Sequence, residues 1–117
     1  MVDMNEKMLI SSENLKIEKL IAMLNEFFSR NKEYGIEIYL KNGITDSIIQ
    51  RLYIPTGRTI SYGKNDYKVM WSDKMSEISI PYDDVISCHE EKDEYNQQSI
   101  TVILKGGLFI EIECVGL

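Results

Sequence analysis

The sequence contains no long apolar run, a single histidine and two cysteines. No stretch approaches the roughly 20 consecutive apolar residues that a membrane-spanning helix needs. Residues 1–16 have neither a basic start nor a long apolar segment, so we expect no secretory signal peptide. Together with the scarcity of cysteine, these absences favour a cytoplasmic protein.

Residues that could carry chemistry are also scarce. Cys88 and Cys114 lie in predicted strands without metal-ligand spacing, so we expect reduced, buried side chains. His89 stands beside two glutamates, and its neighbour Cys88 must point to the opposite face of a strand. The chain has no Walker A sequence, dinucleotide fingerprint, zinc motif or nucleophile elbow. We therefore expect no catalytic residue, no metal and no cofactor, and a protein that is not an enzyme.

The composition indicates one folded domain with an acidic surface. The 117 residues are 44% hydrophobic and 27% charged, which is enough for a core within a single domain, 1–117. The formal net charge is −6, and an acidic chain is a poor general partner for nucleic acid. It can still bind anions where a few cations converge. It can also mimic nucleic acid and bind a basic protein.

Helical periodicity predicts an N-terminal helix over about residues 12–32. The apolar residues of this segment form one stripe: Ile17, Leu20, Ile21, Leu24, Phe27 and Phe28. Ser11 or Ser12 is the expected N-cap. We expect the apolar stripe to pack on a sheet.

From residue 35 onward the apolar residues alternate with polar ones, which predicts short strands over about residues 35–115. The expected strands are 36–41, 45–54, 59–62, 67–72, 77–80, 83–90, 99–105 and 108–115. Asn42-Gly43 predicts a tight hairpin turn after the first strand, and Gly106-Gly107 predicts another before the last. No helix separates the strands, so we expect an α+β, mostly β fold. The helix would precede a strongly bent antiparallel sheet or small barrel.

Two short motifs resemble those of the Sm-like fold, over about residues 35–90. Leu40-Lys41-Asn42-Gly43 resembles the turn that ends the first motif, and Ile78–Cys88 resembles the strand, turn and strand of the second. The second motif is most similar to those of the bacterial Hfq branch and of YolD-like proteins. The resemblance implies a small barrel whose edges pair into rings, so we expect a homo-oligomer.

The chain departs from that family in two respects. Hfq-like proteins place a basic pair after the tyrosine of the second motif, facing RNA, whereas Asp83 and Asp84 follow Tyr82 here. Carboxylates repel phosphate, so the resemblance does not carry an RNA site over to this chain. The predicted hairpin 99–115 lies beyond the Sm core. It can extend the sheet, cover an edge or form an oligomer interface.

The stretch 57–71 is locally basic and interleaves cations with aromatic rings. Cations can bind phosphate and aromatic faces can stack on bases, so this stretch is the candidate ligand site. The candidate ligand-binding residues are Arg58, Tyr62, Lys64, Tyr67 and Lys68, joined by Arg51 from the preceding strand. The competing interpretation is a hairpin with half-buried tyrosines and lysines that keep an edge strand soluble.

Six carboxylates gather within 83–94. They are Asp83, Asp84, Glu90, Glu91, Asp93 and Glu94. Their spacing does not match an EF-hand and no glycine supplies its sharp turn, so a solvated acidic loop is favoured over a metal site. A third interpretation is an acidic surface that binds a basic partner.

The leading functional hypothesis is a non-catalytic binding module, a homo-oligomer that holds a nucleotide-like anionic ligand at an interface between protomers. By analogy with YolD-like and other compact accessory proteins, we expect a phage or mobile-element protein that sequesters a nucleotide signal of host defence. The alternative is an acidic inhibitor that mimics nucleic acid and binds a basic protein such as a nuclease. Sm-like RNA binding is a third hypothesis, disfavoured by the charge.

Overall fold

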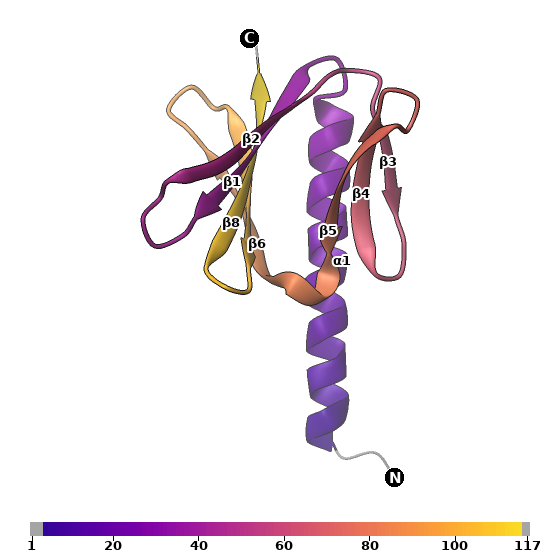
Figure 1. The fold of residues 1–117 in the computed structure, drawn as a ribbon. Coiled ribbons are helices and arrows are strands. Elements are labelled where there is room, and N and C mark those ends of the chain that lie inside the picture. Colours follow the sequence, from indigo (N-terminus) through magenta and orange to yellow (C-terminus); the bar gives the residue numbers. More distant parts are fainter. Residues whose placement is uncertain (1–3, 116–117) are drawn as a thin grey trace.

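The computed structural model describes residues 4–115, with side chains from Leu15 onward. Over these residues the chain forms one long α-helix followed by eight strands, which confirms the α+β, mostly β class (Figure 1). The elements are α1 (Met4–Arg30), β1 (Gly35–Asn42), β2 (Ile48–Ile54), β3 (Thr59–Tyr62), β4 (Asp66–Trp71), β5 (Ser76–Pro81), the 3₁₀ turn η1 (Tyr82–Asp84), β6 (Val85–Lys92), β7 (Gln98–Leu104) and β8 (Leu108–Val115). No helix within the described part of the chain is long and apolar enough to cross a membrane.

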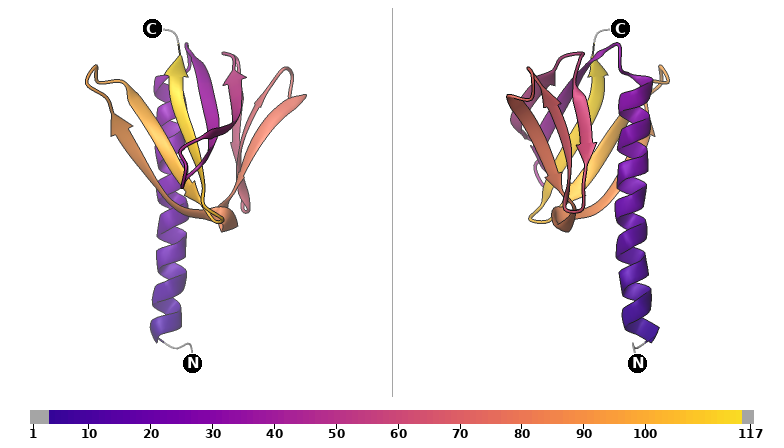
Figure 2. Two further views of the ribbon diagram at one scale, coloured as in Figure 1. Left: turned by 60° about the vertical axis from the view of Figure 1, so that its left-hand side comes forward. Right: turned by 90° about the vertical axis from the view of Figure 1, so that its right-hand side faces the viewer.

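The strands form two antiparallel sheets. One has five strands in the order β2-β1-β8-β7-β6, and the other has three in the order β3-β4-β5. The chain passes between them twice, through residues 55–58 and through η1. Among the described residues no strand pairing joins the sheets, so they are open rather than closed into a barrel. Both sheets lie on the same side of α1, whose N-terminal part extends past them (Figure 2).

The core forms where the apolar face of α1 meets both sheets. Leu20, Leu24 and Phe27 have no exposed surface on the helix side. Ile36 and Ile100 bury against them from the larger sheet. The smaller sheet contributes Tyr67, Val69 and Ile80. Burying each such side chain stabilises the fold by about 1.5–3 kcal/mol. Because both sheets contribute side chains to this core, the helix is their common support.

The alternating pattern decides which strand residues enter this core. In β8, Ile110, Ile112 and Cys114 are buried while the residues between them are partly exposed. Ile112 pairs with Ile38 of β1 on one side and with Ile100 of β7 on the other. Apolar side chains on neighbouring strands therefore lie side by side on the helix-facing surface of the sheet.

The helix differs from its predicted bounds, because it spans Met4–Arg30 and not 12–32. Ser11 and Ser12 lie inside it, so neither is the N-cap. A serine inside a helix costs only about half a kcal/mol, and no proline or glycine precedes it to stop the helix. At the other end the chain turns after Arg30, where the Tyr34 N–H donates to the Asn31 carbonyl at 3.0 Å.

The predicted tight turn at Asn42-Gly43 is instead a longer loop, and β2 begins at Ile48 rather than at residue 45. The Asn42 carboxamide oxygen accepts the Ile44 and Thr45 N–H groups at 2.9 and 3.2 Å, which wraps the loop around it. The N–H of Gly43 donates to the carbonyl of Gly107 at 2.7 Å. This contact draws the loop onto the β7–β8 turn, which a two-residue hairpin would not reach.

The glycine turn predicted before the last strand is confirmed. Gly106 and Gly107 join β7 to β8 with φ angles of 83° and 76°, in the left-handed region that favours glycine. The strand predicted over 83–90 is instead β6, Val85–Lys92, because residues 83 and 84 belong to the η1 turn that follows β5. Tyr82 is buried in this turn, and its hydroxyl donates to the Gly63 carbonyl at 3.0 Å.

Candidate functional site

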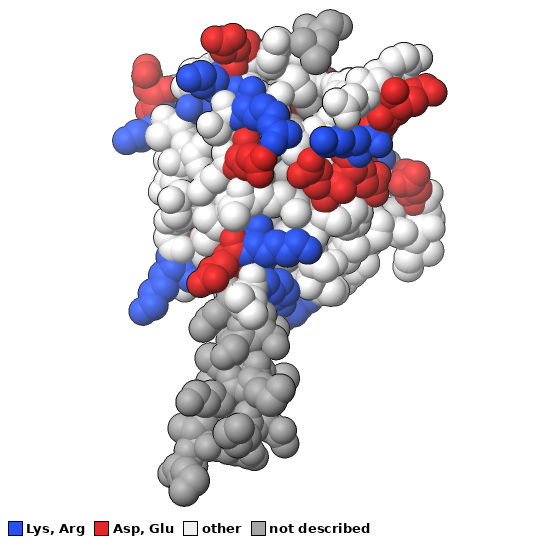
Figure 3. Space-filling model, turned by 180° about the vertical axis from the view of Figure 1, so that it is seen from behind, with Lys and Arg blue, Asp and Glu red and all other residues white. Residues whose placement is uncertain are grey.

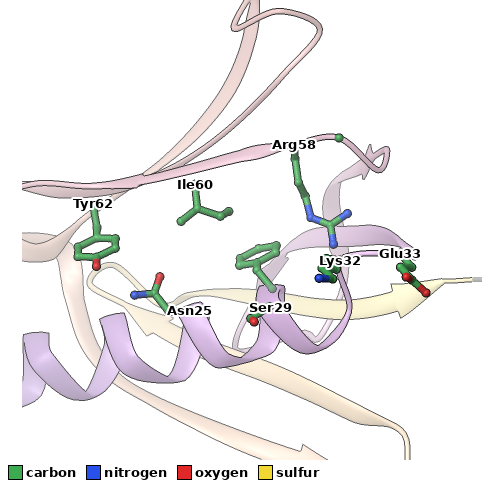
Figure 4. Close-up of a pocket in the computed structure, with 9 residues that line it drawn as sticks. Asn25, Ser29, Lys32, Glu33, Arg58, Ile60 and Tyr62 are labelled. Carbon is green, nitrogen blue, oxygen red and sulfur yellow. The ribbon is translucent and has the colours of Figure 1, made fainter.

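A cleft of about 640 Å³ lies between the C-terminal half of α1 and the edge strand β3 (Figure 4). We call it the α1–β3 cleft. Its lining comes from the helix and the turn after it, and from β3 and the segment that leads into this strand. The residues are Asn25, Phe28, Ser29, Lys32, Glu33, Gly57, Arg58, Ile60 and Tyr62.

The apolar side of the cleft rests on a row of nearly parallel aromatic rings. The rings of Phe28 and Tyr67 lie 6.4 Å apart at 19°, and those of Tyr67 and Tyr62 lie 6.1 Å apart at 10°. Tyr67 has no exposed surface, and its hydroxyl donates to the Asn25 carboxamide oxygen at 2.8 Å. Tyr62 is 54% exposed. The exposed Tyr62 ring thus lies almost parallel to the buried Tyr67 ring.

Arg58 stands at the other end of the cleft and is held by backbone carbonyls. Its Nη1 donates to the carbonyls of Tyr34 at 2.8 Å and Pro55 at 3.3 Å, and its Nη2 donates to that of Asn31 at 2.8 Å. The guanidinium carbon lies 5.5 Å from the centre of the Phe28 ring. Burial lowers the pKa of Arg58 from its ordinary value, but an arginine remains charged at physiological pH.

Arg58 keeps unused hydrogen-bond donors although its guanidinium is held in place. A guanidinium has five N–H groups, and the three carbonyl contacts use three of them. No carboxylate among the described residues forms an ion pair with Arg58. Lys32 adds a second cation to the lining, while Glu33 lies at the end of the cleft far from Tyr62 (Figure 4). The cleft therefore carries a net positive lining in a protein of net charge −6.

The structure divides the residues that the sequence grouped as a ligand site. Arg58 and Tyr62 line the cleft. Tyr67 lies beneath it in the core and is closed to a ligand, which corrects its predicted role. Lys68 follows Tyr67 on β4, so it points to the opposite face of the sheet. Its ammonium lies 4.0 Å from the Asp66 and Glu77 carboxylates.

The remaining two predicted cations also lie outside the cleft lining. Lys64 is exposed in the turn between β3 and β4, beyond Tyr62. Arg51 belongs to β2 of the larger sheet, where its Nη2 is 2.9 Å from the Glu37 carboxylate. Its guanidinium carbon also lies 5.4 Å from the Tyr39 ring centre. Arg51 is thus already paired.

Sequence reasoning missed the helix side of the cleft. Asn25 and Ser29, at positions i and i+4, line it from α1, and Lys32 lines it from the turn that follows the helix. The i, i+4 spacing places Asn25 and Ser29 in one row beside the buried stripe that contains Phe28. The sequence did contain a signal for the helix side of the cleft. Polar residues directly beside the apolar stripe of a helix lie where the helix meets the edge of a sheet.

The six acidic residues of 83–94 do not form one surface. Asp83 and Asp84 belong to η1, and Asp93 and Glu94 follow the other end of β6, which is about 25 Å long. The carboxylate of Asp93 accepts the N–H groups of Tyr95 and Gln97 at 2.9 and 2.8 Å, so it shapes the loop. Acidic and basic side chains interleave on the helix side of the molecule (Figure 3).

Metal-binding and nucleophilic groups do not converge within the described chain. No cluster of three or more His, Cys, Asp or Glu residues there could hold a metal ion. Cys88 and Cys114 are buried without a disulfide, and burial raises the pKa of both thiols. His89 is partly exposed on β6, with its Nε2 3.1 Å from the Glu91 carboxylate.

No protein-family model matches this chain, and comparisons with curated proteins and with solved structures found no similar protein.

Proposed function

We propose that this protein is a non-catalytic binding module that holds a nucleotide-like anionic ligand in the α1–β3 cleft. The observation that carries the proposal is the aromatic row ending at Arg58, a rigidly held cation with unused donors. The cleft of about 640 Å³ is within the usual range for small-molecule sites.

Each part of such a ligand has a matching group in the cleft. A base can stack on the exposed face of Tyr62, and base–aromatic stacking contributes about 1–3 kcal/mol per base. A phosphate can accept charge-assisted hydrogen bonds from Arg58, with Lys32 adding attraction from the turn after the helix. Arg58 is already ordered by three backbone carbonyls, so binding costs little of its side-chain entropy.

We also propose that the protein assembles into a homo-oligomer through its sheet edges. Strands β2 and β6 end the larger sheet, and β3 and β5 end the smaller one. Such edges present unpaired backbone groups that favour pairing with another chain. In this proposal the two open sheets are the halves of an Sm-like barrel, and a neighbouring copy supplies the missing edge contacts. The phage or mobile-element setting, with sequestration of a host-defence nucleotide, remains a hypothesis from that resemblance.

The first test is native mass spectrometry of the protein purified without denaturation from a host cell. We expect an oligomer that carries extra mass of nucleotide size. A monomer without retained mass, together with no heat of binding across a panel of mono-, di- and cyclic nucleotides, would reject both proposals.

Variants then locate the site by calorimetry with the retained nucleotide. Tyr62→Ala and Lys32→Ala change exposed side chains, so the fold is expected to survive. Each should weaken affinity at least about tenfold, which corresponds to about 1.4 kcal/mol. Lys68→Ala is the matched control, because this lysine faces away from the cleft. Equal affinity in all three variants would place the ligand elsewhere.

A further inference from the structure

A second cavity, of about 210 Å³, lies between the end of α1 and the β6–β7 hairpin. It shares no lining residue with the α1–β3 cleft. We call it the Gln98 cavity. Its lining consists of Arg30, Asn31, Lys92, Asn96, Gln97, Gln98 and Cys114.

Gln98 supplies the observation that separates this cavity from an ordinary surface hollow. Its side chain is only 8% exposed, and its Oε1 accepts a hydrogen bond from Arg30 Nη1 at 2.7 Å. A guanidinium has donors and no acceptor, so this contact fixes which end of the carboxamide is the oxygen. The other end, Nε2, is a buried donor with no hydrogen-bond partner among the described residues. Such a donor has room for one acceptor, which a bound ion or a water could supply.

The charged residues that line the cavity have one sign. Arg30 and Lys92 are cations, and none of the lining residues is acidic. Lys92 forms no ion pair with a carboxylate of the described residues, whereas the Nη2 group of Arg30 forms an ion pair with Glu26, which does not line the cavity. The cavity lining thus contains no acidic residue, although the protein has six more acidic than basic residues.

The backbone acceptors near the cavity are already engaged. The Phe27 carbonyl accepts both the backbone N–H and the side-chain Nδ2 of Asn31, at 3.1 and 2.9 Å. The Asn31 carbonyl accepts from Arg58, and the Cys114 carbonyl accepts from Gln97 Nε2 at 2.7 Å. The cavity thus offers donors and cations but few open backbone acceptors.

We propose that the Gln98 cavity binds a compact oxyanion, inorganic phosphate or a phosphate monoester, between Arg30, Lys92 and the Nε2 group of Gln98. A phosphate has enough acceptor oxygens for several donors at once, and its charge matches the two cations. The site is independent of the proposed nucleotide cleft.

The test titrates inorganic phosphate at constant ionic strength, with chloride as the matched salt. It follows the thermal midpoint and the side-chain amide signals of Gln98 and Gln97 by ¹H–¹⁵N NMR. Phosphate should raise the midpoint and shift the Gln98 signals, and chloride should do neither. Lys92→Ala should weaken phosphate binding about tenfold. Lys105→Ala, at an exposed turn outside the cavity, should leave it unchanged.

A second variant tests the amide donor itself. Gln98→Glu has the same shape and keeps an acceptor for Arg30, but it replaces the Nε2 donor with a carboxylate oxygen that repels phosphate. We expect it to abolish binding, and Tyr62→Ala in the cleft to retain it. Phosphate binding that survives both Lys92→Ala and Gln98→Glu would overturn the proposal. So would wild-type signals that do not respond to millimolar phosphate, which would leave water as the partner of Nε2.

Discussion

Replacing Arg58 by alanine should destabilise the fold as well as weaken ligand binding. The side chain connects three carbonyls, at Asn31, Tyr34 and Pro55, that lie between the end of α1 and the start of β3. Alanine removes all of these contacts together with the packing of the guanidinium on Phe28. The substitution therefore disconnects the helix end from the segment that leads into the smaller sheet.

The magnitude follows from the geometry. A hydrogen bond from a charged donor contributes about 1.5–3 kcal/mol when buried, and we take about 1 kcal/mol for each of the two 2.8 Å bonds because Arg58 is partly exposed. The bond at 3.3 Å adds less, and the contact with the Phe28 ring adds about 0.5–1 kcal/mol. The expected loss is about 3 kcal/mol, a large share of the 5–15 kcal/mol typical of a domain.

Urea unfolding, followed by circular dichroism and by the fluorescence of Trp71, measures this loss. Arg58→Lys is the control, since it keeps the charge but cannot contact three carbonyls from one planar group. It should lose about 2 kcal/mol. A loss below about 1 kcal/mol for Arg58→Ala would refute the view of Arg58 as a connection between helix and sheet. Solvent would then satisfy the three carbonyls equally well.

Three further outcomes are expected. Tyr67→Phe removes a buried hydroxyl that bonds to the helix, so the urea midpoint should fall by the equivalent of about 1 kcal/mol. Gly43→Ala should cost about 1–3 kcal/mol, because its Cβ would lie 2.9 Å from a backbone oxygen of the β7–β8 turn, whereas Gly63→Ala meets nothing within 4 Å and should be neutral. The hydrogen bond to Glu37 raises the pKa of Tyr39 from 10.0 to about 12, so the folded state keeps a proton that the unfolded state loses. Stability should therefore fall as pH rises through that window in the wild type, and less steeply in Tyr39→Phe; parallel unfolding profiles over that pH range would contradict this linkage.

Local patterns predicted the elements that depend on neighbouring residues alone. Strands β3 at Thr59–Tyr62 and β8 at Leu108–Val115 begin and end where the alternation does. The glycine pair at 106–107 forms the expected turn, since a backbone in the left-handed region favours glycine. The predicted start of α1 was wrong. A serine favours the N-cap position but can also lie inside a helix, and here the helix continues through Ser11 and Ser12.

The candidate site could be predicted only in part. Arg58 and Tyr62 are close in the chain and share the cleft, so the basic aromatic stretch pointed to the right strand. Lys68 does not join them, because successive residues of a strand face opposite sides and its neighbour Tyr67 is buried. Proximity in the sequence groups cations along the chain, whereas a binding site contains only those side chains that point to the same face of the sheet.

The sequence by itself determined that this is an acidic chain with one helix and many short antiparallel strands, because periodicity and turn chemistry act over a few residues. Tertiary structure alone decided how those strands divide into two sheets and what lies beside each edge. It brought the end of α1 against β3 to form the cleft, and against the β6–β7 hairpin to leave Gln98 with an unpaired donor. These contacts join residues about 30 and 68 positions apart in the sequence, which is farther than any local sequence pattern extends.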